Sequence, residues 1–209
     1  EAQIEFRLKG EEKARVGARL ALIYLFDRMY DKAIASLDKT QVPQLPDALA
    51  SQRVLLRAQA QIGLEQPQIA LELLNPETSK EAEMIRSNVY WREGDWKNAA
   101  KSLNKLTQLM GIKARKPLDD VQAAAVLSLA IANTLSGNEV AIVRLFEMFG
   151  PAMAKTSFID AFKLIAEPSE TGLINYRGLE PIVKKVENFQ GFMEAYRQRV
   201  ADGQLSSLY

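Results

Sequence analysis

The stretch SNVYWREGDWKNA, near the middle of the chain, constrains the fold more than any other. Small residues, Ser87 and Ala99, stand at its two ends, while Gly94 lies between Tyr90 and Trp96. A glycine between two helical patterns ends the first helix because it adopts a left-handed backbone conformation without a steric penalty. The spacing therefore predicts a helix–turn–helix hairpin in which Tyr90 fills the space between the helices and the small residues let them approach closely.

Related patterns occur elsewhere in the chain. In a first hairpin Arg28 occupies the position of Gly94, so we expect a less relaxed turn there. In a second hairpin Gly63 stands at the turn, and its separation from the small residue Ala70 predicts a longer turn than in the third. A fourth hairpin is expected to turn at Gly137. Together the four patterns predict helices at Glu12–Phe26, Tyr30–Lys39, Ala48–Ile62, Pro67–Leu74, Lys80–Glu93, Trp96–Leu109, Val121–Leu135 and Glu139–Phe149.

These hairpins resemble the tetratricopeptide repeat family. Its pattern of small, aromatic and glycine positions is matched in the third hairpin by the stretch above, and in the first by Leu20, Ala21, Tyr24, Tyr30, Ala33 and Leu37. The turn glycines of the later hairpins lie about 31 and about 43 residues apart, on either side of the roughly 34 residues typical of the family. Beyond the repeat itself, the chain is similar to the C-terminal part of larger, uncharacterised bacterial repeat proteins.

The resemblance implies an all-α fold, an α-α superhelix in which antiparallel helix hairpins stack as a solenoid. After the last repeat, the apolar residues Phe158, Phe162 and Ile165 predict a further helix, and we expect a helical C-terminal cap to seal the solenoid. The chain opens without Met, which suggests a fragment of a longer protein or a processed form. The expected organisation is a truncated lead-in at 1–11, repeats at about 12–40, 48–75, 80–110 and 118–150, a helical cap at 151–200 and a frayed tail at 201–209.

Composition excludes most familiar catalytic sites. The chain contains no His and no Cys, so it cannot build a Ser-His-Asp triad, a Cys nucleophile, a zinc finger or an imidazole metal site. No glycine-rich phosphate loop, nucleophile elbow or acidic metal loop occurs. An enzyme of carboxylate chemistry stays open from composition alone but has no motif behind it. We therefore expect a protein that is not an enzyme and uses no metal or cofactor.

In the family that the chain resembles, the first helices of successive hairpins line a concave surface that binds a partner. Projecting the third hairpin's spacing onto the others gives an expected binding surface, apolar at its ends and polar with an aromatic residue in the middle. If Gly63 sets the register of the second hairpin, its members there are Arg53, Arg57 and Ala60; if Ala70 does, they are Leu55, Gln59 and Ile62. The alternative is that the apolar members are covered by neighbouring helices or by an upstream part of the protein. The expected binding residues are Arg53, Arg57, Met84, Asn88, Trp91, Arg92, Leu127 and Ile131.

Two other features of the sequence have less specific explanations. The basic run of Lys97, Lys101, Lys105, Lys113, Arg115 and Lys116 could meet phosphates, but no interleaved aromatic residues accompany it, and an exposed lysine face is usually only solvated. Asp119 and Asp120 could form an acid–base pair, but adjacent residues point to different faces, so helix capping is the better interpretation. Asn88 matches one position of the carboxylate clamp in chaperone-binding members of the family. Because Met84 replaces the clamp's lysine, we do not expect recognition of chaperone tails.

The sequence thus predicts a protein–protein interaction scaffold that binds a peptide or helix of a partner on its concave face. The alternative is a structural module for self-association as a homo-oligomer, or for packing against the upstream part of its own chain. With a net charge of +1 we expect no nucleic-acid partner, and the most apolar run, residues 121–132, is too short to span a membrane. We expect a soluble protein, and nothing in the sequence chooses between the bacterial cytoplasm and the periplasm.

Overall fold

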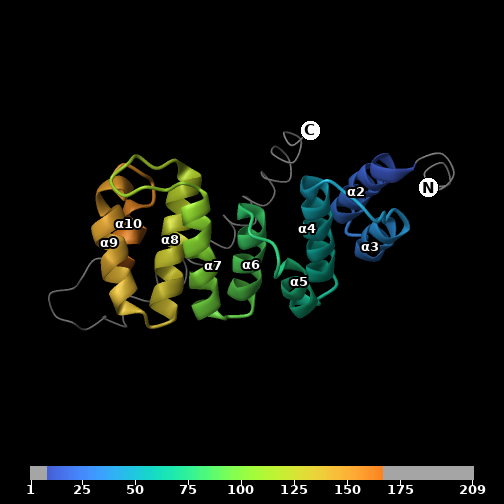
Figure 1. Ribbon diagram of the computed structural model, residues 1–209. Coiled ribbons are helices and arrows are strands. Elements are labelled where there is room, and N and C mark those ends of the chain that lie inside the picture. The colour runs from blue at the N-terminus through green and yellow to red at the C-terminus, as the bar shows by residue number, and fades with distance from the viewer. Residues whose placement is uncertain (1–8, 167–209) are drawn as a thin grey trace. The chain divides into compact units, whose positions relative to one another are not determined.

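The computed structural model describes residues 9–166, and within them the protein is all-α, as the sequence predicts (Figure 1). Helix α3 has the expected bounds, and α2 ends as expected but starts two residues early, at Gly10. Most ends of the later helices agree with the prediction within one or two residues. The helices are α2 (Gly10–Phe26), α3 (Tyr30–Lys39), α4 (Asp47–Gly63), α5 (Pro67–Leu74), α6 (Lys80–Arg92), α7 (Trp96–Leu109), α8 (Asp120–Leu135), α9 (Glu139–Met153) and α10 (Ile159–Ala166).

Four of the turns between helices share one backbone geometry. Each contains a single residue in the left-handed conformation: Gly94 and Gly137, both at φ 72°, and at the equivalent places Arg28 at φ 58° and Glu65 at φ 60°. The residue after it donates its N–H to the carbonyl five positions earlier, as Asp95 does to Tyr90 at 2.9 Å. The same bond closes the other three turns at 2.8–2.9 Å. This bond satisfies a carbonyl at the helix end that has no partner within the helix.

The expectation of a longer second turn was wrong. Gly63 is the last residue of α4, and the left-handed residue of that turn is Glu65, which stands as far before Ala70 as Gly94 stands before Ala99. The sequence misled us because Glu, an unusual residue for this conformation, holds the position. Gly63 has a different role. A Cβ atom there would lie 2.4 Å from the ring of Tyr30, so the missing side chain lets α3 and α4 approach.

Side-chain caps begin the later helices where the sequence places polar residues. The Ser79 hydroxyl accepts from the N–H of Ala82, and because position 82 is alanine only half of a capping box forms, as expected. Asp119 starts α8 with a complete box, in which Gln122 bonds back to the backbone of Asp119. The capping interpretation of this acidic pair is therefore confirmed. Asp95 and Asn138 cap α7 and α9 by a single bond each, in which the side-chain oxygen accepts from the backbone N–H three residues later.

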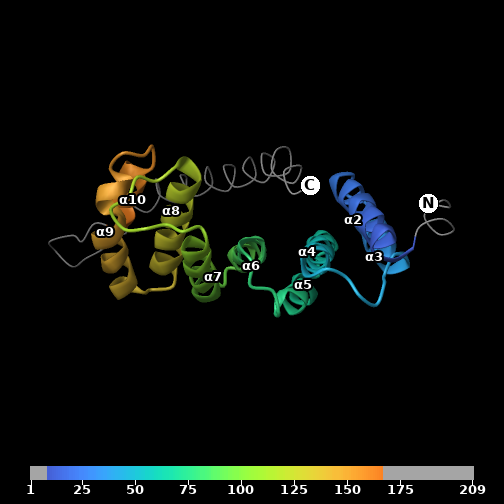
Figure 2. The same cartoon turned by 45° about the horizontal axis from the view of Figure 1, so that its top comes forward.

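Helices pack mainly on their neighbours along the chain. The pairs α2/α3, α4/α5, α6/α7 and α8/α9 are in contact, and α3 and α4, α7 and α8, and α9 and α10 join one pair to the next (Figures 1 and 2). Small residues occupy the crossings. The alanines buried there are Ala14, Ala18, Ala21, Ala33, Ala58, Ala60, Ala70, Ala82 and Ala99. Because their side chains are short, the helix backbones can approach closely.

Helix α9 continues past its expected end at Phe149 as far as Met153, with Pro151 inside its last turn. Proline at this place removes one backbone donor and its ring crowds the carbonyl four residues earlier, and α9 ends two residues after it. The predicted further helix is α10, whose Phe162 is fully buried and stacks on Phe146 of α9 with ring centroids 6.2 Å apart. The rest of the expected cap and the expected tail, residues 167–209, lie outside the described residues, as do residues 1–8.

Candidate partner-binding surface

Helix α6 carries the part of the expected binding surface that the structure leaves accessible. Met84, Asn88 and Trp91 stand on one side of the helix and are half-buried, and Arg92 beside them is exposed. The indole of Trp91 meets that of Trp96 edge to face, with centroids 5.3 Å apart and planes at 89°. Edge-to-face contact is a favoured arrangement of aromatic rings. It joins the end of α6 to the start of α7 and orients the Trp91 side chain.

Another side of α6 is held by charged groups. The Glu83 carboxylate is only 3% exposed, and its Oε1 lies 2.8 Å from Arg86 Nη1 and 3.5 Å from Lys105 Nζ of α7. Arg86 also donates to the carbonyl of Leu74, the last residue of α5, and at 2.5 Å to that of Glu77 in the loop after it. Buried charges are stable only when paired in this way. These bonds fix how α6 is turned relative to both neighbouring helices.

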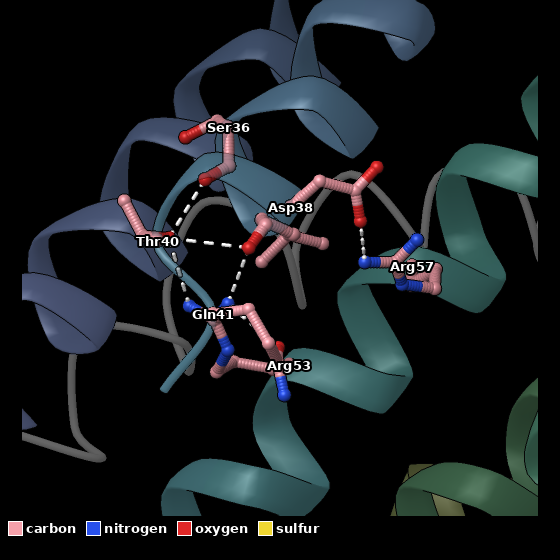
Figure 3. A network of polar contacts seen from close by, with 7 residues as sticks. Ser36, Asp38, Thr40, Gln41, Arg53 and Arg57 are labelled. Carbon is pink, nitrogen blue, oxygen red and sulfur yellow. Dashed lines mark hydrogen bonds and ion pairs between the residues drawn. The ribbon is translucent and has the colours of Figure 1, made fainter. Parts of the chain in front are cut away.

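Arg53, expected at the binding surface, instead lies in the interior. It is 5% exposed and donates to the carbonyls of Ala14 at 2.7 Å and Leu37 at 2.5 Å, and to the side chains of Thr40 and Gln41 at 3.2 and 3.3 Å (Figure 3). Its donors are thus committed to α2 and α3. The prediction for Arg53 is corrected, because a guanidinium with four intramolecular acceptors is not available to a partner.

Arg53 stays charged although its surroundings lower the pKa of its side chain. Burial lowers the pKa of its guanidinium from the ordinary value, the nearby charge of Arg57 lowers it further, and the Asp38 carboxylate raises it. An arginine pKa starts so far above neutrality that the group stays protonated at physiological pH. Arg57 in turn forms an ion pair with Asp38 across the α3/α4 contact (Figure 3). It is half-exposed, but its charge is already paired within the chain.

The geometry of the second turn decides between the two registers that the sequence left open. Because Glu65 is the turn residue, Ala70 sets the alignment, and the positions equivalent to Met84, Asn88 and Trp91 are the alternative set. In that set Gln59 is exposed, while the two apolar side chains are partly buried and pack against the cluster around Ala58 and Leu74. The members of this set are Leu55, Gln59 and Ile62.

In the fourth hairpin the expected residues are covered. Leu127 and Ile131 are 4% and 5% exposed, within a run from Ala123 to Asn133 in which every residue is buried. Helix α8 touches α7, α9 and α10, so its apolar sides face other helices. The alternative explanation, that apolar members of the pattern are covered by neighbours, describes these two residues. The accessible expected residues are therefore concentrated on α6.

Other kinds of site find little support in the described residues. Between residues 9 and 166, no three acidic side chains converge where a metal ion could be held. Over the same residues, no helix has both the length and the apolar character that crossing a bilayer requires.

The chain matches no family model, no curated protein and no solved structure. The resemblance to tetratricopeptide repeats therefore depends on the motif residues of the sequence.

The structure also assigns a role to two arginines that the repeat pattern does not explain. Arg53 and Arg86 are each the seventh residue of their helix, α4 and α6, and each donates to carbonyls at the end of the helix before it, at Leu37 and Leu74. We call these two side chains the arginine clasps. The shared target was not visible in the sequence, because the acceptors are backbone carbonyls and because the two arginines lie one helical turn apart when counted from the turn residues Glu65 and Gly94.

Proposed function

We propose that this chain is a non-catalytic interaction scaffold of the tetratricopeptide type, which binds a peptide or a helix of a partner protein along α6. The observation that carries the proposal is the row formed by Met84, Asn88 and Trp91, which stays partly accessible. In α8 the residues equivalent to the first two, Leu127 and Ile131, are buried. A half-buried tryptophan beside an exposed arginine has the composition typical of residues that dominate binding energy at interfaces.

The surroundings of this row support binding rather than simple solvation. The Trp96 ring holds the Trp91 ring from one side. The bonds from Arg86 to the carbonyls of Leu74 and Glu77 fix the orientation of α6 against the end of α5. A partner would therefore meet side chains whose conformations are already restricted, which lowers the entropic cost of association. Asn88 between two apolar neighbours offers both a donor and an acceptor to a peptide backbone. Peptides that lie in helical grooves are recognised by such mixed surfaces.

The test uses a display library of random peptides, selected on the purified chain. We expect that Trp91→Ala weakens the binding of selected peptides by about ten-fold or more, because the truncation of an aromatic anchor typically costs more than 1 kcal/mol. The melting temperature should stay close to that of the unchanged chain. Affinity is measured by fluorescence anisotropy and folding by thermal unfolding.

Phe26→Ala is the matched control, since Phe26 is a large aromatic residue that is 52% exposed but lies on α2. This variant should bind the selected peptides as the unchanged chain does. Equal affinity of the Trp91 variant, or a loss of its thermal stability, would count against the proposed surface.

A second candidate function, a structural module for self-association, is favoured by one observation. Helix α9 exposes several large apolar side chains, Val140 at 64%, Val143 at 39% and Met148 at 46%. Apolar patches of this kind on a folded surface often contact another protein. Light scattering separates the two functions. A monomer at all concentrations supports the peptide-binding scaffold, and a discrete dimer that the substitution Val140→Asp dissociates supports the structural module.

A further inference from the structure

The largest group of like charges that no opposite charge interrupts runs along α7 and the loop after it. Residues 96–118 contain no Asp and no Glu, although the whole chain carries a net charge of only +1. All six basic side chains of this stretch are exposed, and together they form what we call the lysine surface. Its members are Lys97, Lys101, Lys105, Lys113, Arg115 and Lys116.

Pairing within the chain does not neutralise this surface. Lys105 lies 3.5 Å from the buried carboxylate of Glu83, and Lys101 donates to the Asn98 side chain at 3.2 Å. Among the ion pairs formed by residues 9–166, the other members of the surface have none. Its positive charge is therefore directed to the solvent and available to a ligand.

The needs of helix stability explain only part of the pattern. Lys113, Arg115 and Lys116 follow the C-terminal end of α7, where positive charge is favourable to the helix dipole. Lys97, in contrast, is the second residue of α7, where positive charge opposes the dipole. Lys97, Lys101 and Lys105 also follow one another at intervals of four residues, an arrangement of like charges that destabilises an isolated helix. A ligand of opposite charge would compensate this unfavourable arrangement.

We infer that the lysine surface binds an acidic segment of a protein partner. Its lysines recur along α7 about once per helical turn, at steps of roughly 6 Å, and carboxylates four residues apart on an acidic helix have the same spacing. Lys105 already meets a carboxylate in the structure, that of Glu83. The inference rests on the proposed function in one respect, that the partner is a protein. It adds a second contact surface and the charge of the segment that occupies it.

Nucleic acid fits this surface less well. Proteins that hold single strands combine cations with aromatic rings on which the bases stack. Within residues 96–118 the only aromatic residue is Trp96, and its ring already packs against that of Trp91. Phosphate groups are also bound preferentially by the two-pronged arginine side chain, and Arg115 is the only arginine of the surface. Point charges on flexible lysine stems suit carboxylates distributed along a peptide.

The experiment measures binding of a fluorescein-labelled oligoglutamate peptide to the full chain by anisotropy, at low and at physiological salt. The test variant is K97E/K101E/K116E, which leaves Lys105 beside Glu83 unchanged. The control is K39E/K155E/K163E, which changes the net charge equally at exposed lysines of α3, of the loop after α9, and of α10. We expect the test variant to bind about ten-fold or more weakly, and the control to lose less than about three-fold. Binding to the unchanged chain should weaken as salt increases.

A single-stranded oligonucleotide of matched charge and vesicles rich in phosphatidylserine are measured in parallel. The inference is overturned if oligoglutamate does not bind at low salt, if both variants lose affinity alike, or if the oligonucleotide or the vesicles bind more tightly than the peptide. Thermal unfolding of both variants shows whether they fold. The selected display peptides test the surface around Trp91 and not the lysine surface. The peptide-binding function and the acidic-segment inference can therefore fail independently of each other.

Discussion

Close contact, and not backbone conformation, requires glycine at two positions of the first two hairpins. A Cβ atom at Gly17 would lie 1.8 Å from the Thr40 hydroxyl oxygen, and one at Gly63 would lie 2.4 Å from the Tyr30 ring. Thr40 takes part in the polar network with Arg53, and Tyr30 begins α3, so neither neighbour can move without disturbing a helix contact. The first contact joins α2 to α3, and the second joins α3 to α4.

We predict that Gly63→Ala lowers the free energy of unfolding by about 2 kcal/mol, because the added methyl group must displace an aromatic ring packed between helices. The measurement is urea unfolding followed by circular dichroism. Gly150→Ala is the control, since its nearest neighbour outside the local backbone, the ring of Phe146, would lie at an ordinary 3.9 Å. At that position alanine should change the free energy of unfolding by less than about 1 kcal/mol, because its better helix propensity is opposed by crowding of its Cβ against the ring of Pro151. A Gly63 variant as stable as the unchanged chain would show that the ring moves freely.

The contacts that join one hairpin to the next differ in polarity. Those between α3 and α4 and between α5 and α6 include arginine hydrogen bonds, whereas the contact between α7 and α8 has none from the corresponding residue. The arginine clasps join α4 to α3 and α6 to α5, each by donating to carbonyls at the end of the earlier helix. In α8 the seventh residue is Val126, which is fully buried. Helix α8 thus packs on α7 without a corresponding arginine. The stability of a polar contact depends on hydrogen-bond geometry and on the cost of desolvation, whereas the stability of an apolar contact depends on the buried apolar area.

We predict that Arg53→Met lowers the free energy of unfolding by about 2–4 kcal/mol. The variant removes a donor from the buried carbonyls of Ala14 and Leu37 and from the Thr40 hydroxyl. Loss of hydrogen bonds to buried polar atoms, with an apolar side chain placed against them, is costly. Arg57→Met is the matched control. It removes a half-exposed ion pair with Asp38 on the same helix, and such pairs contribute at most about 1 kcal/mol.

Urea unfolding measures both variants. If Arg53→Met and Arg57→Met destabilise the protein equally, the clasp has no special role, and the buried donors of Arg53 add nothing beyond surface electrostatics.

In the described part of the molecule, burial is distributed unevenly. Residues Ala123–Asn133 of α8 are all buried, and α8 contacts helices on both sides of it in the chain. At the other extreme, α5 has 8 residues, of which only Ala70 and Leu74 are buried. Because local opening is least favourable where most apolar contacts must break, the backbone of α8 should open last.

Native-state hydrogen exchange tests this expectation. We predict that amides in the middle of α8 exchange most slowly among the helices of residues 9–166, and that those of α5 exchange among the fastest. Mass spectrometry of peptic fragments gives the comparison. Exchange in α8 as fast as in α5 would mean that α8 is not the centre of the most stable packing unit.

Most of the secondary structure could be predicted because its signals are local. Gly94 and Gly137 adopt the expected left-handed conformation, Asp119 caps α8, and the ends of several helices agree with the sequence pattern. The second turn was misplaced because its left-handed residue, Glu65, carries no compositional signal, whereas Gly63 beside it does. A glycine required by tertiary contact and a glycine required by a turn look identical in a sequence.

By itself, the sequence determined that this chain forms helix hairpins, where most of them turn, and which catalytic and metal sites its lack of His and Cys excludes. Only the tertiary structure decided which residues of the repeated pattern are accessible. Arg53 and Leu127 are buried while Trp91 remains partly exposed, although all three were expected on one binding surface. The physical reason is that a turn depends on a few adjacent residues, whereas the exposure of a helix side depends on the neighbouring helix that packs against it.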